Sequence, residues 1–274
     1  MRKYLKIELR RLVKSPALYI ALAIGCVITV SHVIQFAIDK TKANELELFL
    51  ENAFWYPHSV FNSIMGLSSF DWQTTAFIAI APLLAAIPFG NSYFIDIKSG
   101  YIKNLYTRAK KSDYLKAKYM STFISGVMVI GVPMLVNLML CMMLVPILTP
   151  ISGSGLFPVL DGSMWVDLYY AHPFIYLFGF ILINSLFGGL YACLTLAGSY
   201  IIGNKFLVQL FPYIIITIGE MFLSVLNLNR FSPSILLNMS QPTPIQGIHL
   251  VIAFIVLFLM TWSYYWKGLK SDAL

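Results

Sequence analysis

One carboxylate lies inside a long apolar run of this 274-residue chain. Glu220 belongs to the run 206–226, whose other residues are uncharged. An ionisable side chain within a bilayer is costly, and it usually marks a pathway, a gate or a ligand contact. The alternative is a position near the outer surface, because Asn227 and Arg230 follow closely. We therefore treat Glu220 as a candidate gate or substrate contact.

No other pattern predicts catalysis. The sequence has neither an H-E-x-x-H nor a G-x-S-x-G motif, and its four histidines are scattered rather than grouped with carboxylates. The stretch "GSYIIGNK" (198–205) is not a phosphate-binding P-loop, because Asn204 separates the second glycine from Lys205. The three cysteines suit neither a disulfide framework nor a metal site. We expect a chain that is not an enzyme, hydrolyses no ATP itself and needs no cofactor or metal.

The composition places the chain in a membrane. It is 58% hydrophobic and only 11% charged, whereas a soluble domain carries roughly 25% charged residues. Six runs approach the roughly 20 apolar residues that cross a bilayer. We predict an all-α polytopic membrane protein of one domain, residues 1–274, with spans at about 17–37, 74–94, 119–148, 173–200, 206–226 and 247–266.

The distribution of charge predicts the orientation. If the N-terminus is cytoplasmic, sixteen of the nineteen Lys and Arg residues fall on the inner side, as the positive-inside rule requires. Six spans then place both termini in the cytoplasm. The net charge of +7 follows from this topology, so we expect no nucleic-acid partner. A cleaved signal peptide is the alternative at the N-terminus, but the first apolar run continues past Cys26 to Ala37, which is too long for one.

Two amphipathic helices are predicted outside the spans. Residues 1–16 place Leu5, Leu9 and Leu12 on one face and basic residues on the others, which suits a helix lying on the inner leaflet. Residues 45–56 predict a short acidic helix on the outer interface. This second helix either covers the bundle or forms a lid over a pathway.

The most basic segment, residues 96–119, joins the second and third runs and holds seven Lys or Arg residues. An apolar stripe interleaves with these charges at helical spacing and ends before a basic turn at 108–112. Retention in the cytoplasm requires charge alone, so the stripe predicts docking against a partner. Its members are Ile97, Tyr101, Ile102, Leu105 and Tyr106.

Together these features resemble the permease subunit of an ABC-2 type transporter. The family's loop pattern is an acidic residue, a glycine four positions on, an apolar helix, a basic turn with proline and a lysine at the start of span three. Asp96, Gly100, "YIKNLY" and Lys118 follow that order. Asp96 stands where glutamate is usual, and Ala109 stands where proline is common. The resemblance covers nearly the whole chain.

The resemblance implies a translocation pathway formed with a second permease subunit, identical or related, and driven by separate ABC ATPase subunits. The bilayer and a hydrophobic substrate would be its other partners. Small bacterial members suggest export of an antimicrobial peptide, or immunity to one, at the bacterial cytoplasmic membrane. The loop would be the coupling helix, seated on the ATPase through Ile97, Gly100, Tyr101, Ile102, Leu105, Tyr106 and Arg108.

Two other functions stay open. A membrane scaffold or immunity protein could bind a peptide or partner without transport, and it would need no ATPase. A membrane-embedded enzyme would require a convergent pair of polar groups within the spans, and the sequence offers only Glu220 for this.

Overall fold

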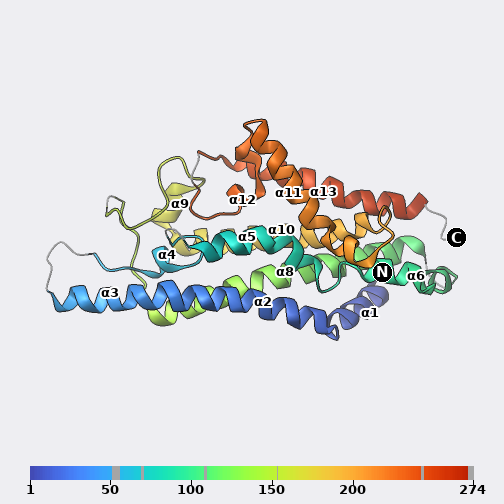
Figure 1. Cartoon of the computed structure of the whole chain (residues 1–274), viewed down its shortest axis with the longest axis horizontal. Coiled ribbons are helices and arrows are strands. Elements are labelled where there is room, and N and C mark those ends of the chain that lie inside the picture. Colours follow the sequence, from blue (N-terminus) through green and yellow to red (C-terminus); the bar gives the residue numbers. More distant parts are fainter. Residues whose placement is uncertain (51–55, 69–70, 108–109, 153, 242–243, 271–274) are drawn as a thin grey trace.

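The computed structural model describes residues 1–50, 56–68, 71–107, 110–152, 154–241 and 244–270. These residues form helices and connecting segments, with no strand among them. Figure 1 shows an elongated bundle with α3 at one end and α6 at the other. We call the first the α3 end and the second the α1 end, because α1 contacts α6 there. The polytopic helical fold is therefore confirmed, with five helices long and apolar enough to cross a membrane: Pro16–Leu48, Lys111–Leu144, Pro173–Gly198, Lys205–Val225 and Gly247–Lys270.

The first span continues well beyond its predicted end. The helix α2 (Pro16–His32) passes through a π-helical turn, η1 (Val33–Ala37), into α3 (Ile38–Phe49) without a break. A 33-residue helix is about 50 Å long, which exceeds a hydrocarbon core of about 30 Å. The prediction of a separate outer helix at 45–56 was wrong for residues 45–49, which belong to α3 and continue the first span. No glycine or proline between Ile38 and Phe49 interrupts the helix. Residues 51–55 lie outside the described part of the chain.

The second predicted span, 74–94, is interrupted. Its apolar helix α5 ends at Ala86 after 15 residues (Trp72–Ala86), and a turn leads into α6 (Ser92–Lys98). Pro88 has no N–H with which to extend the helix. Gly90 packs so closely on Thr195 that a Cβ there would lie 2.7 Å from the Thr195 Oγ1. α5 is too short to be counted with the five candidate spans.

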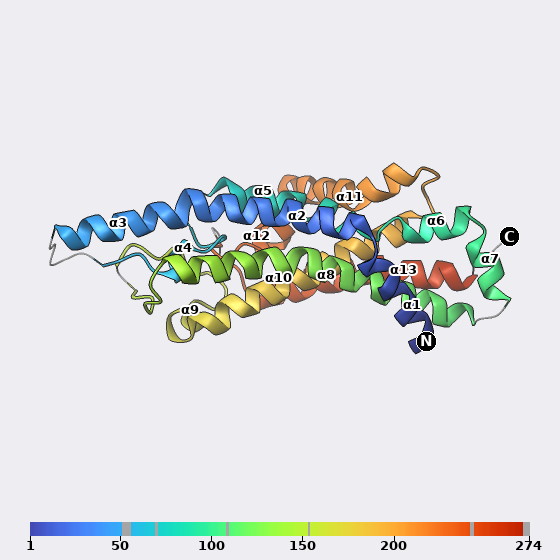
Figure 2. The same ribbon diagram turned by 90° about the horizontal axis from the view of Figure 1, so that it is seen from below.

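The remaining spans agree with the predicted runs to within a few residues, except that the third begins earlier. Its helix, α8, starts at Lys111, eight residues before the expected position. The last turn of α13 lies at the same end of the bundle as α1 and α6 (Figures 1 and 2). In chain order the other elements are α1 (Arg2–Val13), α4 (Val60–Ser63), α7 (Tyr101–Tyr106), α8 (Lys111–Leu144), α9 (Val166–Ala171), α10 (Pro173–Gly198), α11 (Lys205–Val225), η2 (Asn229–Phe231), α12 (Pro233–Leu236) and α13 (Gly247–Lys270).

Small residues bring α8 and α10 into backbone contact at the centre of the bundle. A Cβ built on Gly126 would lie 2.2 Å from the carbonyl oxygen of Gly188, and one built on Gly188 would lie 2.5 Å from Ile130. Small residues allow such an approach between membrane helices. Gly188 and Ala192 of α10 therefore pack against α8 of the same chain.

The helix α11 packs differently from the others. Only Val208 and Pro212 are buried along its 21 residues, and large apolar side chains such as Phe222 and Val225 are exposed. A groove separates α11 from α13, and Glu220 of α11 is one of the residues that line it.

Candidate functional site

Two short helices, α6 and α7, project at the α1 end of the bundle (Figure 2). Gly100 joins them with a φ of 71°, a left-handed conformation that glycine adopts without steric cost. A side chain at this position would meet no atom, so the backbone conformation explains the glycine. We call residues 92–107 the α6–α7 segment.

The structure divides the predicted apolar stripe between two environments. Ile102 is 4% exposed and packs in a core with Tyr114 and Leu115, and Leu105 and Tyr106 lie partly buried against that core. The first residues of the stripe face outward instead: Ile97 is 40% exposed and Tyr101 is 39% exposed. Arg108 lies outside the described residues.

A cluster of four charges, three of them buried and the fourth, Arg11, half-buried, fixes the α6–α7 segment to α1 and α8. Lys118 on α8 is fully buried, and its Nζ donates to Asp96 Oδ2 at 2.6 Å and to Glu8 Oε2 at 2.9 Å. Arg11 reaches the same two carboxylates, donating to Asp96 Oδ1 at 2.8 Å and to Glu8 Oε1 at 2.9 Å. The Tyr114 hydroxyl donates to Asp96 Oδ2 at 2.7 Å. We call these five residues the charge cluster.

The charges of the cluster balance. A buried charge is tolerated only when it is paired and hydrogen-bonded, and both carboxylates meet both cations here. Burial alone would raise the pKa of Asp96, but the hydrogen bonds and charges of Arg11 and Lys118 outweigh it and hold that pKa below the ordinary value of 3.8. The cluster therefore joins three elements that are distant in sequence.

The lowered pKa of Asp96 predicts a pH dependence. A carboxylate with a pKa lowered by folding contributes stability above the ordinary value of 3.8, and it loses that contribution as the pH falls through the lowered value. We expect the thermal unfolding midpoint in detergent to be nearly constant from pH 7 to pH 5 and to fall below pH 4. The Asp96→Asn variant should lack that part of the acid-induced fall. A wild-type fall between pH 7 and pH 5 that Asp96→Asn removes would contradict this assignment.

Sequence reasoning identified only part of this cluster. Asp96 and Lys118 were noted as members of a loop pattern, but their contact with Glu8 and Arg11 was not predicted. Glu8 is the only acidic residue among the first sixteen. That isolated carboxylate in a basic helix was the available signal. The N-terminal helix is thus docked on α8 through Glu8 and Leu12, while Arg2, Lys3 and Lys6 remain exposed.

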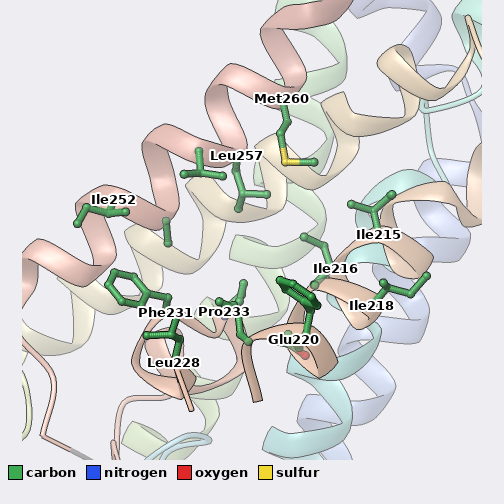
Figure 3. A pocket seen from close by; sticks show the side chains of 15 residues that line it. Ile215, Ile216, Ile218, Glu220, Leu228, Phe231, Pro233, Ile252, Leu257 and Met260 are labelled. Carbon is green, nitrogen blue, oxygen red and sulfur yellow. The ribbon is translucent and has the colours of Figure 1, made fainter. Parts of the chain in front are cut away.

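Glu220 ties α11 to the turn that follows it. Its Oε1 accepts hydrogen bonds from the Ser234 backbone N–H at 2.7 Å and from the Ser232 hydroxyl at 3.0 Å. The side chain also lines an open groove of about 590 Å³ between α11 and α13, seen in Figure 3. The same residue lines a smaller pocket of about 130 Å³ that Tyr191 of α10 and Pro82 of α5 also line.

A second buried polar cluster lies toward the α3 end. His32 is fully buried, and its Nε2 lies 2.7 Å from Ser68 Oγ and 3.2 Å from Asp71 Oδ2. Asn137 Nδ2 lies 3.1 Å from His32 Nδ1, and Asn137 is held in that orientation because its Oδ1 accepts from the Met65 N–H. The scattered histidines of the sequence give no indication of this contact between His32 and Asp71.

This second cluster differs from a serine hydrolase triad. A triad needs the serine and the carboxylate on opposite nitrogens of the imidazole, whereas Ser68 and Asp71 both face Nε2. Ser68 also donates to Asp71 at 2.6 Å, so its proton is directed to the carboxylate. The arrangement joins the end of α2, the turn at 64–68, Asp71 and α8 by hydrogen bonds. Among the described residues, no group of three or more His, Cys, Asp or Glu side chains could hold a metal ion.

No protein-family model, no curated protein and no solved structure matches this chain. Function must therefore be argued from the charge cluster, the α6–α7 segment and Glu220.

Proposed function

We propose that this chain is the permease subunit of an ABC-2 type transporter in a bacterial cytoplasmic membrane, coupled to separate ATPase subunits. The observation that carries the proposal is the α6–α7 segment at one end of the bundle. It exposes Ile97 and Tyr101 and is anchored to α1 and α8 by buried charges. Contact with an ATPase needs both properties. Exposed apolar side chains bind the partner, and ion pairs to α1 and α8 transmit its movement to the bundle.

The pathway in this proposal is shared with a second permease subunit. The face of α11 supports this, since it leaves Phe222, Met221 and Val225 largely exposed. Apolar walls of this kind suit a hydrophobic substrate, including an antimicrobial peptide that is exported or neutralised. With the α1 end in the cytoplasm, ATP-driven closure of the ATPases would move the α6–α7 segment and, through Lys118, the base of α8.

The test uses the two outward residues of the stripe. Ile97→Asp and Tyr101→Asp should each weaken binding of the partner ATPase by about thirtyfold, because loss of a central interface anchor costs about 2 kcal/mol. Stimulation of ATP hydrolysis should fall in parallel, measured with the chain reconstituted with a co-purified ABC ATPase. Leu160→Asp is the matched control, since Leu160 is 69% exposed and lies outside the α6–α7 segment. Full assembly and coupling in both stripe variants would disprove the docking role.

A non-transporting scaffold or immunity protein is the alternative proposal. It would bind its peptide or partner with no ATPase present, and the two stripe variants would leave that binding unchanged.

Leu105 and Tyr106 are unsuitable for the ATPase-binding test, because they pack against the core and their replacement would disturb the fold.

A further inference from the structure

The groove between α11 and α13 opens beside two helices that can cross a membrane. Its walls are apolar side chains, among them Ile218 and Phe222 of α11 and Ile252 and Met260 of α13. Figure 3 shows these walls converging where Phe231 and Pro233 close one end of the groove. Both Ile218 and Phe222 are more than half exposed. In a bilayer, the medium at the mouth of this groove is hydrocarbon.

Glu220 is the one ionisable side chain that lines this groove. Its carboxylate accepts hydrogen bonds from two neutral donors, the Ser232 hydroxyl and the Ser234 N–H, and no described Lys, Arg or His lies within ion-pair distance of it. A carboxylate beside hydrocarbon without a countercharge attracts a cation strongly, because the local dielectric constant is low. The groove therefore combines an apolar cleft with one unbalanced negative charge.

Glu220 also stands between this groove and the inner pocket. Ile216, Glu220 and Pro233 line both spaces, and the inner pocket adds the polar residues Tyr213 and Thr217. The hydrogen bonds to Ser232 and Ser234 hold the carboxylate where the two spaces meet. A cation that displaces these donors would free the 232–234 turn.

We infer that the groove binds an amphiphilic cation, with its apolar chain between α11 and α13 and its ammonium group at Glu220. A primary ammonium has three donors and stays protonated at neutral pH, so it can bond the carboxylate oxygens. Diacylglycerol and phosphatidylglycerol have no ammonium group and should not bind at Glu220. The assignment of such a molecule as the transported substrate rests on the proposed function, whereas its binding does not.

Photolabelling tests the inference without an ATPase. The purified chain in nanodiscs of phosphatidylcholine, whose quaternary ammonium has no N–H to donate, is irradiated with dodecylamine that carries a diazirine at its chain end, and labelled peptides are identified by mass spectrometry. A second apolar groove of about 240 Å³, lined by Ile183 and Phe254 and by no charged residue, is an internal control for partitioning. We expect about tenfold more labelling of the α11–α13 groove, competed by dodecylamine and not by dodecanol.

Two variants separate charge from shape. Glu220→Gln removes the charge but keeps an oxygen to accept from Ser232 and Ser234, and it should reduce labelling about tenfold. Gly219→Leu keeps the charge and fills the groove, since a Cβ at Gly219 meets no atom within 4 Å, and it should reduce labelling as much. Equal labelling of both grooves, or undiminished labelling in Glu220→Gln or in Gly219→Leu, would overturn the inference. Those results would leave the coupling test with Ile97 and Tyr101 unaffected, so the two proposals can fail separately.

Discussion

Replacing Lys118 with Met is expected to lower the free energy of unfolding by about 3–5 kcal/mol, which is the usual cost of breaking a buried ion pair. The ammonium group is the centre of the charge cluster, and its removal leaves Glu8 and Asp96 facing each other with Arg11 as their only cation. Glu8 and Asp96 are each 2% exposed, so water cannot replace the lost hydrogen bonds. Met has a similar length, so the loss reflects charge and not volume.

Lys116 provides the matched control for this prediction. It lies two residues away on α8 and is exposed, with its Nζ 5.8 Å from the centre of the Tyr265 ring. Lys116→Met should change the stability by less than about 1 kcal/mol. The measurement is the unfolding midpoint in detergent for both variants. Equal midpoints would show that the charge cluster contributes little to stability.

A double variant isolates the electrostatic part of the effect. When Asp96→Asn accompanies Lys118→Met, one carboxylate and one cation are removed together while Arg11 still pairs with Glu8, and much of the lost stability should return. Failure to recover any stability would mean that Lys118 acts through packing. Its Nζ lies 4.6 Å from the centre of the Phe89 ring, which is one such contact.

Replacing Gly126 with Ala is expected to cost about 3 kcal/mol, although it adds a single methyl group. The new Cβ would lie 2.2 Å from the carbonyl oxygen of Gly188 and 2.7 Å from its carbonyl carbon. These are backbone atoms of α10, so the two helices must separate, and such overpacking costs 1–3 kcal/mol or more. Because α8 and α10 form the centre of the bundle, their separation also loosens the contacts of their neighbours.

Gly179→Ala is the control for this second prediction. Gly179 lies on α10, and a Cβ there would meet no atom within 4 Å. Alanine favours a helix over glycine by about 1 kcal/mol in water, so this variant should be neutral or slightly more stable. The ratio of folded to aggregated protein after extraction, together with the unfolding midpoint, measures both variants. Similar stability of the two would contradict the close approach of α8 and α10.

The apolar runs predicted most of the spans because helix length in a membrane follows hydrophobicity directly. The fourth and fifth runs also have local start signals, Pro173 at the first turn of α10 and Asn204, whose side chain caps α11. The second run failed because the break at Pro88 and Gly90 lies within an apolar stretch, where hydropathy does not change. The first run does form a candidate span, but its predicted end at Ala37 was wrong because the polar residues that follow still favour a helix.

The polar contacts were much less predictable. The charge cluster joins Glu8, Asp96 and Lys118 across more than a hundred residues, and a single sequence carries no signal of such pairing. His32 meets Asp71 where the turn at 64–68 packs on α2 and α8, through Ser68 and the Met65 N–H. The stripe from Ile97 to Tyr106 was predicted as one surface, but the left-handed turn at Gly100 separates its outward residues from those that face the core.

The separation of 110 residues between Glu8 and Lys118 also fixes an order of events during synthesis. Residues 2–13 leave the ribosome first, yet their partner carboxylate and ammonium groups emerge only after α5 has been made and α8 has begun. Until then Glu8 has no buried partner outside its own helix, and the exposed basic residues of α1 suit a helix resting on an anionic leaflet. The contacts of α1 with Asp96 and Lys118 can therefore form only after the start of α8 has been made.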